Sequence, residues 1–315
     1  MTVTVLAIGE SLIDVVDAPD EDGSPILVEH PGGSPMNIAY GAARLGLPSI
    51  LLTAIGPDAR GAAIAEHLEA AGVEIAPASF RDEETSSATA HIQPDGSARY
   101  DFDLRWSLPP DLVVPPADIV HVGSIAAFLE PGGTSVLALV RELAASDHPP
   151  VITFDPNMRP SIVTDHASAL VRFEELAAGT TVLKLSDEDA EWLYPDASVD
   201  EAIDRILALG PALVAVTRGG DGAVLATAAD RVQVPGVSVE VADTIGAGDS
   251  FMSALIYQLA QLLDTDAATR ADIADASVLA TPVIEAIGAF AVACAGITVS
   301  RPGANPPALD ELPPA

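Results

Sequence analysis

The chain has 315 residues, 49% of them hydrophobic, and a formal net charge of −32. This length and apolar content are enough for a large core, in one big α/β domain or in one domain with a small appendage. The acids are spread along the chain, which disfavours binding to nucleic acid or to an anionic membrane, and no run of 18 or more apolar residues predicts a membrane span.

Short β-rich runs alternate with helical patterns along the chain. Strands are predicted at 3–9, 49–56, 118–124, 151–156, 181–186 and 213–219, and helices at 60–71, 133–146 and 200–209. Several of these strands are nearly continuous apolar runs, as expected of parallel strands buried on both faces. The alternation predicts an α/β fold with a doubly wound, mostly parallel sheet and helices on both faces. Ligands of such sheets lie at the carboxyl ends of the strands.

Two segments interrupt the alternation. Residues 11–30 and residues 86–106 each carry an Asp-Gly pair between alternating runs, which is a hairpin signal. Two hairpins inserted into an α/β domain predict a small β-sheet that lies as a lid over the edge of the active site.

The stretch "GESLID" follows the first predicted strand. Its Asp14 lies just past the carboxyl end of that strand, where a ligand would lie. A carboxylate there can accept hydrogen bonds from two neighbouring hydroxyls. Taken alone, an acid in a solvated loop is the simpler explanation of Asp14, and both interpretations stay open.

The stretch "HPGGSPMNIAYGAARLGLP", residues 30–48, predicts a loop and then a helix. Gly33 lets the backbone pass close to another group, Ser34 is expected as the N-cap, and Pro35 fits the first helical position. Gly46 is expected to end this helix. Asn37 then lies in the first turn, where its amide either donates to and accepts from hydroxyls or completes the local cap.

The stretch "DTIGAGDSF", residues 243–251, places three small residues and an acid before an apolar run. The backbone N–H groups of Gly246, Ala247 and Gly248, with the start of the following helix, predict an anion hole that fits a phosphoryl group. Asp249 would face the same point and take the proton of an attacking hydroxyl. The alternative is an ordinary acid in the first turn of a helix. No Walker pattern is present, so backbone dipoles, Mg²⁺ and arginine would have to balance the phosphate charge.

Together these stretches resemble the PfkB/ribokinase family of sugar kinases, from the first strand to about residue 307. "GGSPMNIAYGAARLG" is similar to the N-terminal signature of that family, and "DTIGAGDSF" to its C-terminal signature. "DPNMR" (155–159), "KLSDED" (184–189) and "VTRGGDGA" (216–223) look most like the fructokinase branch. The resemblance implies a single ribokinase-like domain over residues 1–315, ATP and Mg²⁺ as cofactors, and a lid that is also a dimer interface.

The resemblance also assigns residues. Asp249 is implied as the catalytic base, beside the anion hole formed by Gly246, Ala247 and Gly248. The sugar is implied to contact Asp14, Gly32, Gly33, Asn37, Phe102, Arg105 and Arg159. The nucleotide is implied to lie along Lys184, Ser186, Asp189, Thr217, Gly219, Gly222 and Val292. A site for a monovalent cation such as K⁺ is implied at Asp243, Ile245, Val299 and Ala304.

Some of these positions depart from the family pattern or have a simpler explanation. Ser186 and Asp189 stand where the family often has Asn and Glu near Mg²⁺ and phosphate, and Ser-x-x-Asp also predicts a capping box. Val292 stands where many members have Asn or His beside the adenine. A salt bridge at the end of a strand explains Arg159. Lid-to-lid packing explains Phe102 and Trp106 as well as sugar contact does.

We expect an ATP-dependent kinase that phosphorylates a primary hydroxyl of a small sugar, with fructose as the first choice. Ribose, 2-keto-3-deoxygluconate and nucleosides stay open, as does a catalytically silent relative that binds sugar or nucleotide. A dinucleotide-dependent oxidoreductase is disfavoured because no G-x-G-x-x-G follows a strand. The N-terminus lacks the features of a signal peptide, and Cys294 is alone in an apolar run, so we expect a cytoplasmic protein. The resemblance implies a homodimer through the lid.

Overall fold

The computed structural model describes residues 2–19, 25–92, 98–265 and 267–312. Its main sheet has nine strands in the spatial order β13-β12-β11-β10-β9-β8-β1-β4-β5. All pairs from β11 to β5 are parallel, whereas β12 and β13 add an antiparallel edge. In chain order, the strands are β1 (Val5–Ile8), β4 (Ser49–Leu52), β5 (Glu74–Ile75), β8 (Ile119–Gly123), β9 (Val151–Asp155), β10 (Val182–Ser186), β11 (Leu213–Thr217), β12 (Ala223–Ala226) and β13 (Arg231–Val234).

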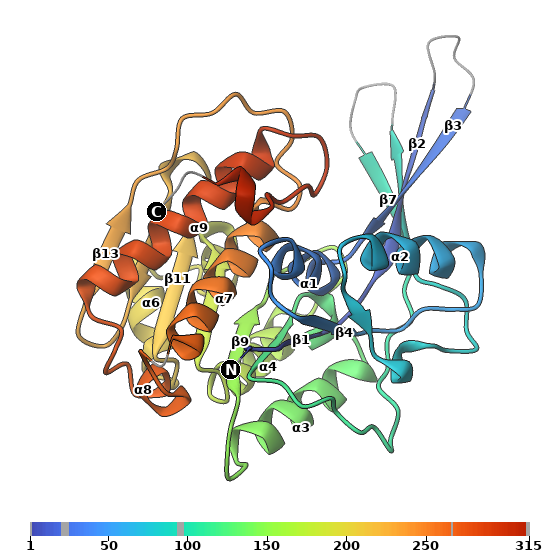
Figure 1. Cartoon of the computed structure of the whole chain (residues 1–315). Coiled ribbons are helices and arrows are strands. Elements are labelled where there is room, and N and C mark those ends of the chain that lie inside the picture. Colours follow the sequence, from blue (N-terminus) through green and yellow to red (C-terminus); the bar gives the residue numbers. More distant parts are fainter. Residues whose placement is uncertain (1, 20–24, 93–97, 266, 313–315) are drawn as a thin grey trace.

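Helices cover both faces of this sheet, as the alternating pattern predicts (Figure 1). One face packs against α3 (Gly132–Ala144), α4 (His166–Ala177), α5 (Asp187–Leu193) and α6 (Val199–Leu207). The other face packs against α1 (Ser34–Arg44), α2 (Ala59–Ala70), α7 (Ala247–Asp264), α8 (Arg270–Ala274) and α9 (Thr281–Val299). Short 3-10 helices lie at Pro77–Ser79, Ile125–Ala127, Gly219–Asp221 and Leu309–Glu311.

The strands contribute to both cores because successive side chains point to opposite faces. On β9, Phe154 is fully buried against Phe173 of α4, with ring centroids 5.8 Å apart, while Val151 belongs to the core on the other face. Burying side chains of this size stabilises the fold by roughly 1.5–3 kcal/mol each. The nearly continuous apolar runs in the sequence are therefore explained by a sheet that is covered on both sides.

A separate four-stranded sheet stands away from the main sheet, with its ends projecting at the upper right of Figure 1. Its strands are β2 (Leu12–Pro19), β3 (Pro25–Gly32), β6 (Ser87–Ile92) and β7 (Ala98–Asp103). The two antiparallel hairpins, β2–β3 and β6–β7, confirm the two that the sequence predicts. Parallel pairing of β2 with β6 joins them into one sheet, which we call the lid. The Asp-Gly pairs of the expected turns lie outside the described residues.

One helix of the described chain, α9, is long and apolar enough to cross a membrane by length and composition, with a mean hydropathy of 1.9. In the structure it packs against α7 and against β12 and β13, and Ile284, Ile287 and Ala291 of this helix are buried in the core. Cys294, on the same helix, is buried, as the sequence predicts, and burial raises the pKa of its thiol to about 12. The hydropathy of α9 is thus that of a core helix.

Candidate active site

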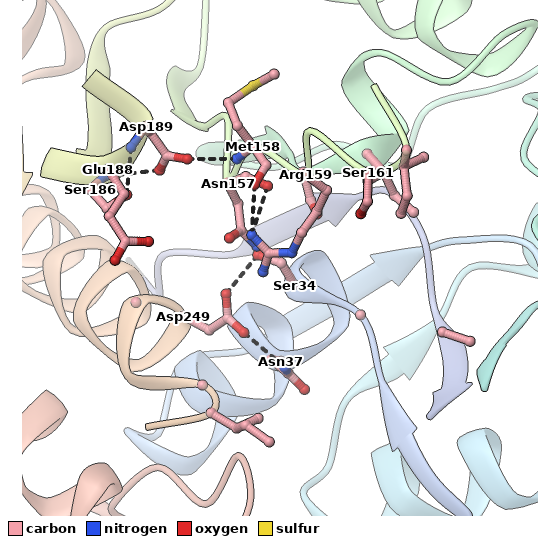
Figure 2. Close-up of a pocket in the computed structure, with 18 of the residues that line it drawn as sticks. Ser34, Asn37, Asn157, Met158, Arg159, Ser161, Ser186, Glu188, Asp189 and Asp249 are labelled. Atoms are coloured by element: carbon pink, nitrogen blue, oxygen red, sulfur yellow. Dashed lines mark hydrogen bonds between the residues drawn. The ribbon is translucent and has the colours of Figure 1, made fainter. Parts of the chain in front are cut away.

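The carboxyl ends of the parallel strands and the underside of the lid enclose one cleft (Figure 2). Its volume of about 810 Å³ is that of a small-molecule site. Most of the site residues expected from the sequence line it, namely Asp14, Gly33, Asn37, Phe102, Arg159, Lys184, Ser186, Asp189, Thr217, Gly219, Ile245, Gly246, Gly248 and Asp249. Segments far apart in the sequence therefore meet at the edge of the sheet where ligands of doubly wound folds bind.

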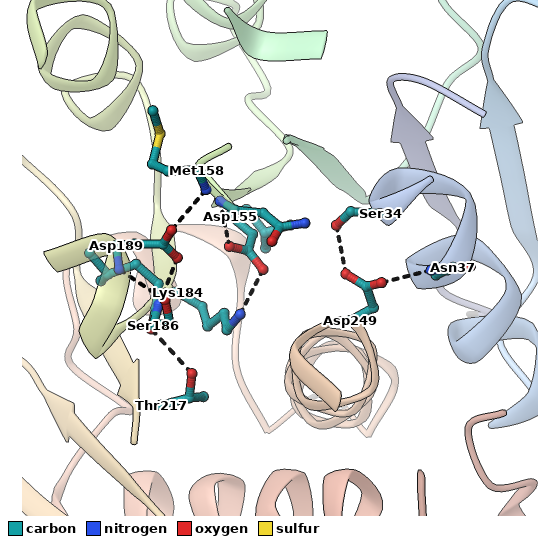
Figure 3. A network of polar contacts seen from close by, with 12 residues as sticks. Ser34, Asn37, Asp155, Met158, Lys184, Ser186, Asp189, Thr217 and Asp249 are labelled. Carbon is teal, nitrogen blue, oxygen red and sulfur yellow. Dashed lines mark hydrogen bonds and ion pairs between the residues drawn. The ribbon is translucent and has the colours of Figure 1, made fainter. Parts of the chain in front are cut away.

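Asp249 lies in the first turn of α7 and is 9% exposed. Its two carboxylate oxygens accept hydrogen bonds from two side chains of α1 (Figure 3). The Ser34 hydroxyl donates to Oδ1 at 2.6 Å, and Nδ2 of Asn37 donates to Oδ2 at 2.8 Å. The first turn of a second helix therefore holds the Asp249 carboxylate at the cleft.

The contacts of α1 correct one expectation. Gly33, not Ser34, is the N-cap, and no side chain caps this helix. Ser34 is the first helical residue, and its hydroxyl bonds to Asp249 instead of to the backbone. Asn37 likewise turns its N–H donor to Asp249 and not to the local cap. The helix ends before Gly46, whose φ of 92° suits glycine at that position.

The small residues predicted to form an anion hole lie at the start of α7, where Gly246 and Gly248 line the cleft. Gly246, the N-cap, has the left-handed φ of 75° that favours glycine, and it turns the chain so that the first N–H groups of the helix are free of side-chain caps. At Gly248 a Cβ would lie 2.8 Å from Nζ of Lys184, so a side chain here would displace the end of the lysine. Backbone donors and a buried ammonium group thus lie together at one wall of the cleft, which fits the phosphates of a nucleotide.

Lys184, the only lysine of the chain, is 3% exposed and donates to Oδ2 of Asp155 at 2.8 Å (Figure 3). Burial raises the pKa of Asp155 to about 6, although Lys184 opposes this shift. Burial alone would lower the pKa of Lys184, but Asp155, Asp189 and Asp249 outweigh it and raise that pKa. The ammonium group therefore stays charged near neutral pH and faces three carboxylates.

Ser186 and Asp189 form a capping box at the start of α5. Oδ2 of Asp189 accepts from the backbone N–H of Ser186 at 3.0 Å, and Oδ1 accepts from the N–H of Met158 at 2.8 Å. This confirms the capping interpretation. It also joins α5 to the loop after β9, so the Asp189 carboxylate holds two walls of the cleft together. Among the described residues, no group of three or more His, Cys, Asp or Glu side chains is arranged to hold a metal ion.

Glu10 is a cleft residue that the sequence reasoning missed. It follows β1, is 5% exposed, and accepts from the N–H of Ala126 at 3.0 Å. Burial raises its pKa from 4.5 to about 7; a hydrogen bond from Ser124 opposes the shift, and the charge of Asp249 adds to it. An acid directly after a buried strand, in the pair "GE", was the signal that could have pointed to this residue.

The lid side of the cleft is more open. Asp14, on β2, is exposed to the cleft. Desolvation by the neighbouring atoms raises the pKa of its carboxyl group, while the charges of His30 and Arg159 oppose this shift. A Cβ at Gly32 would lie 2.2 Å from Oδ2 of Asp14, so Gly32 makes room for this carboxylate. Phe102, on β7, lines the cleft and is 38% exposed.

Arg159 enters the cleft from the loop after β9 and donates to the carbonyls of Asn157 and Met158 (Figure 2). Within the described ranges it forms no ion pair, so the interpretation as a salt bridge at the end of a strand is wrong. Its charge is partly satisfied by backbone oxygens and otherwise faces the cavity. Asp14 is the carboxylate whose pKa it influences.

Several expected site residues lie away from the cleft. Arg105 pairs with Asp103 at 3.0 Å and with Glu84 at 3.7 Å beside a different, smaller cavity. Trp106 is buried and donates to the carbonyl of Ala126, so neither sugar contact nor lid-to-lid packing explains it. Gly222, with φ of 93°, approaches the backbone of Val234 too closely for a side chain, and Val292 is a buried core residue of α9.

The expected cation site consists of two segments that lie side by side. Oδ1 of Asp243 accepts from the N–H of Ile245 at 3.0 Å, and Oδ2 accepts from the N–H of Gly303 at 2.9 Å. These backbone hydrogen bonds lower the pKa of Asp243. The carbonyl of Val299 accepts from the N–H groups of residues 242 and 243, and Ala304 contacts Gly246. The same carboxylate therefore orders the loop that leads to the anion hole.

Comparisons with known proteins agree with this fold and point to one family. A fructokinase of Rhizobium leguminosarum bv. trifolii is 32% identical over 263 residues, which cover 81% of this chain and 79% of the relative. Among solved structures, the fructokinase of Vibrio cholerae O395 with bound fructose, ADP and calcium ion is 25% identical and has a TM-score of 0.78, with 96% of this chain and 94% of the other covered. The ATP-bound fructokinase of Xylella fastidiosa, at 24% identity and a TM-score of 0.80 over 99% and 97% of the two chains, shows the same fold.

The model of the pfkB family of carbohydrate kinases matches residues 3–311. That range contains both sheets, the cleft and Asp249. The chain therefore belongs to the pfkB family and is a sugar kinase most similar to the fructokinase branch.

Proposed function

We propose that this enzyme transfers the γ-phosphoryl group of ATP to a primary hydroxyl of fructose, with Asp249 as the catalytic base. The observation that carries the proposal is the place of the Asp249 carboxylate, which lies in the first turn of α7, a turn with no side-chain cap, and is held by α1 at the cleft. An acceptor for a proton and donors for a phosphoryl group stand together there, as phosphoryl transfer needs.

The reaction needs few groups from the protein. When bound, ATP supplies the phosphoryl group. Asp249 orients the sugar hydroxyl and takes its proton as the oxygen attacks. The N–H groups of residues 246–248, with the Lys184 ammonium group behind them, stabilise the negative charge that develops on the phosphoryl oxygens.

Different observations support ATP, Mg²⁺ and a monovalent cation as cofactors. The close packing of Gly248 on Lys184 supports nucleotide phosphates at the start of α7, next to Thr217 and Gly219 of the cleft wall. We propose Mg²⁺ as the accompanying ion. Glu188 lines the cleft and is a candidate ligand, because the backbone already occupies both oxygens of Asp189. A monovalent cation near Asp243 stays a prediction, supported by the potassium ion bound to a related fructokinase.

A second substrate is favoured by one observation. Arg159 faces the cleft without a carboxylate partner among the described residues, and a guanidinium group pairs well with a carboxylate. This supports 2-keto-3-deoxygluconate, which carries an anionic group that fructose lacks.

An ADP-release assay with fructose, ribose, 2-keto-3-deoxygluconate, adenosine and fructose 6-phosphate, each below KM, tests the proposal. We expect the highest kcat/KM with fructose. A preference for 2-keto-3-deoxygluconate that is lost in Arg159→Met would overturn fructose and assign the second substrate. No sugar-dependent ADP release with any acceptor would argue for a catalytically silent relative.

We also propose that the enzyme is cytoplasmic and forms a homodimer through the lid. Leu27, Val28, Tyr100 and Phe102 of the lid are exposed, and a thin sheet with apolar side chains in solvent needs a cover. Light scattering of the full chain tests the dimer, and a monomer at micromolar concentration would contradict it.

A further inference from the structure

Ser34 is used in an unusual way for a serine at the start of a helix. Such a serine normally caps the helix by accepting a backbone N–H bond. Here Gly33 occupies the capping position, and the Ser34 hydroxyl donates to Oδ1 of Asp249, 215 positions away in the sequence. The hydroxyl is buried, and its distance of 2.6 Å to Oδ1 is short for two oxygens, as in hydrogen bonds to an ionised acceptor.

Ser34 and Asn37 bind different oxygens of the Asp249 carboxylate (Figure 3). Each oxygen of Asp249 receives one donor from the first turn of α1. A carboxylate oxygen has two lone pairs, so one on each oxygen is left for a guest in the cleft. The two bonds thus fix the rotation of the carboxylate and decide which lone pairs face the sugar hydroxyl.

Both donors are neutral, whereas the neighbouring Asp155 is paired with the Lys184 ammonium group. Ser34 and Asn37 therefore orient the Asp249 carboxylate without placing a cation on either of its oxygens.

We propose that Ser34 is a positioning residue for sugar phosphorylation, acting through Oδ1 of Asp249. This inference rests on the proposed function of Asp249. The competing explanation is structural: the bond could merely tie α1 to α7, which also pack together elsewhere, as where Gly41 contacts Ser253.

Ser34→Ala, measured in wild type and in Asp249→Asn, separates the two explanations. With fructose and ATP at saturation, we expect kcat to fall about 10- to 100-fold in the wild-type background, the range for a bond to a charged acceptor, with the KM for ATP unchanged. In Asp249→Asn the same change should have little further effect, because residues that act as one unit are not additive. A similar fall in both backgrounds would mean a structural role and would overturn the proposal.

Two further variants make the outcome decisive. Ser34→Thr keeps the hydroxyl and should recover most of the wild-type kcat. Ser250→Ala is the matched control: Ser250 is next to Asp249 and 2% exposed, and its Oγ has no hydrogen-bond partner in the described chain, so kcat should not change. Wild-type kcat in Ser34→Ala would overturn this inference alone. A wild-type enzyme that prefers another sugar would correct the proposed substrate, and the Ser34 series would be run with that sugar.

Discussion

The two walls of the cleft are built in different ways. The wall formed by the main sheet and the start of α7 is a closed polar network, in which Asp249, Asp155, Asp189 and Lys184 are buried and each bonds to a named partner. The lid wall carries Asp14 and Phe102 on an exposed surface. The difference suggests that the buried wall performs the chemistry, which tolerates little movement, while the open wall selects the sugar.

The largest expected effect tests the buried wall. Asp249→Asn should keep both hydrogen-bonded helices in place but remove the base, so kcat should fall by about 10²–10⁴. Calorimetry should show that fructose and ATP still bind. A variant that retains more than about half of the wild-type kcat would rule out the assigned role.

Lys184→Met should reveal how much the stability of that wall depends on the ion pair between Lys184 and Asp155. Removing the cation leaves Asp155 buried without a charged partner, which should lower the free energy of unfolding by about 3–5 kcal/mol. Chemical denaturation measures this loss. Arg141→Met is the control: its ion pair with Glu175 is exposed, so the change should be below about 1 kcal/mol. Equal effects at the two sites would show that burial of the Lys184 pair is unimportant.

Glu10 makes a pH-dependent contribution to stability. Its folded-state pKa of about 7 lies above its ordinary value of 4.5, so between these pH values the native state holds a proton that the unfolded chain has lost. The contribution of Glu10 to the free energy of unfolding is fully present below about pH 4.5 and is lost as the pH rises through 7. Glu10→Gln removes the titration, so its unfolding free energy relative to wild type should rise by about 2.5 kcal/mol from pH 5 to pH 8.

Denaturation of both proteins at the two pH values tests this expectation. The titration of Asp155, whose pKa of about 6 also lies in this range, is common to both proteins and cancels in the difference. A difference that does not depend on pH would mean that Glu10 does not titrate in this window.

The smallest effect is expected at the lid. Asp14→Ala should raise the KM for sugar about 10- to 100-fold, through lost hydrogen bonds to a charged acceptor, and leave the KM for ATP nearly unchanged. Asp103→Ala is a control on the same sheet, because Asp103 pairs with Arg105 outside the cleft. If Asp14→Ala changed both KM values equally, the division between the two walls would be wrong.

The sequence predicts those parts of the molecule whose signals are local. The strand from Val151 to Asp155 is a nearly continuous apolar run, and the small residues before Asp249 mark the start of α7 at the cleft, so the fold class and the proposed anion hole follow from neighbouring residues. The capping box of Ser186 and Asp189 is local as well, and it is confirmed.

What the sequence could not predict depends on distant residues. The Ser34 hydroxyl looked like a cap because its partner lies 215 positions away. The family resemblance implied Arg105 as a sugar ligand, but the fold turns it to Asp103 and to Glu84 of a different segment. Glu10 was missed because its burial results from packing and not from its neighbours in the sequence.

The burial of the only lysine also affects how the protein can be handled. No lysine amine is available on the described surface, so reagents directed at amines would have to react at the chain terminus while the protein is folded. A protease specific for lysine has a single cleavage site, inside strand β10 of the central sheet. That bond becomes accessible only when the sheet opens, so the appearance of two fragments would report unfolding of the core, whatever the lid is doing.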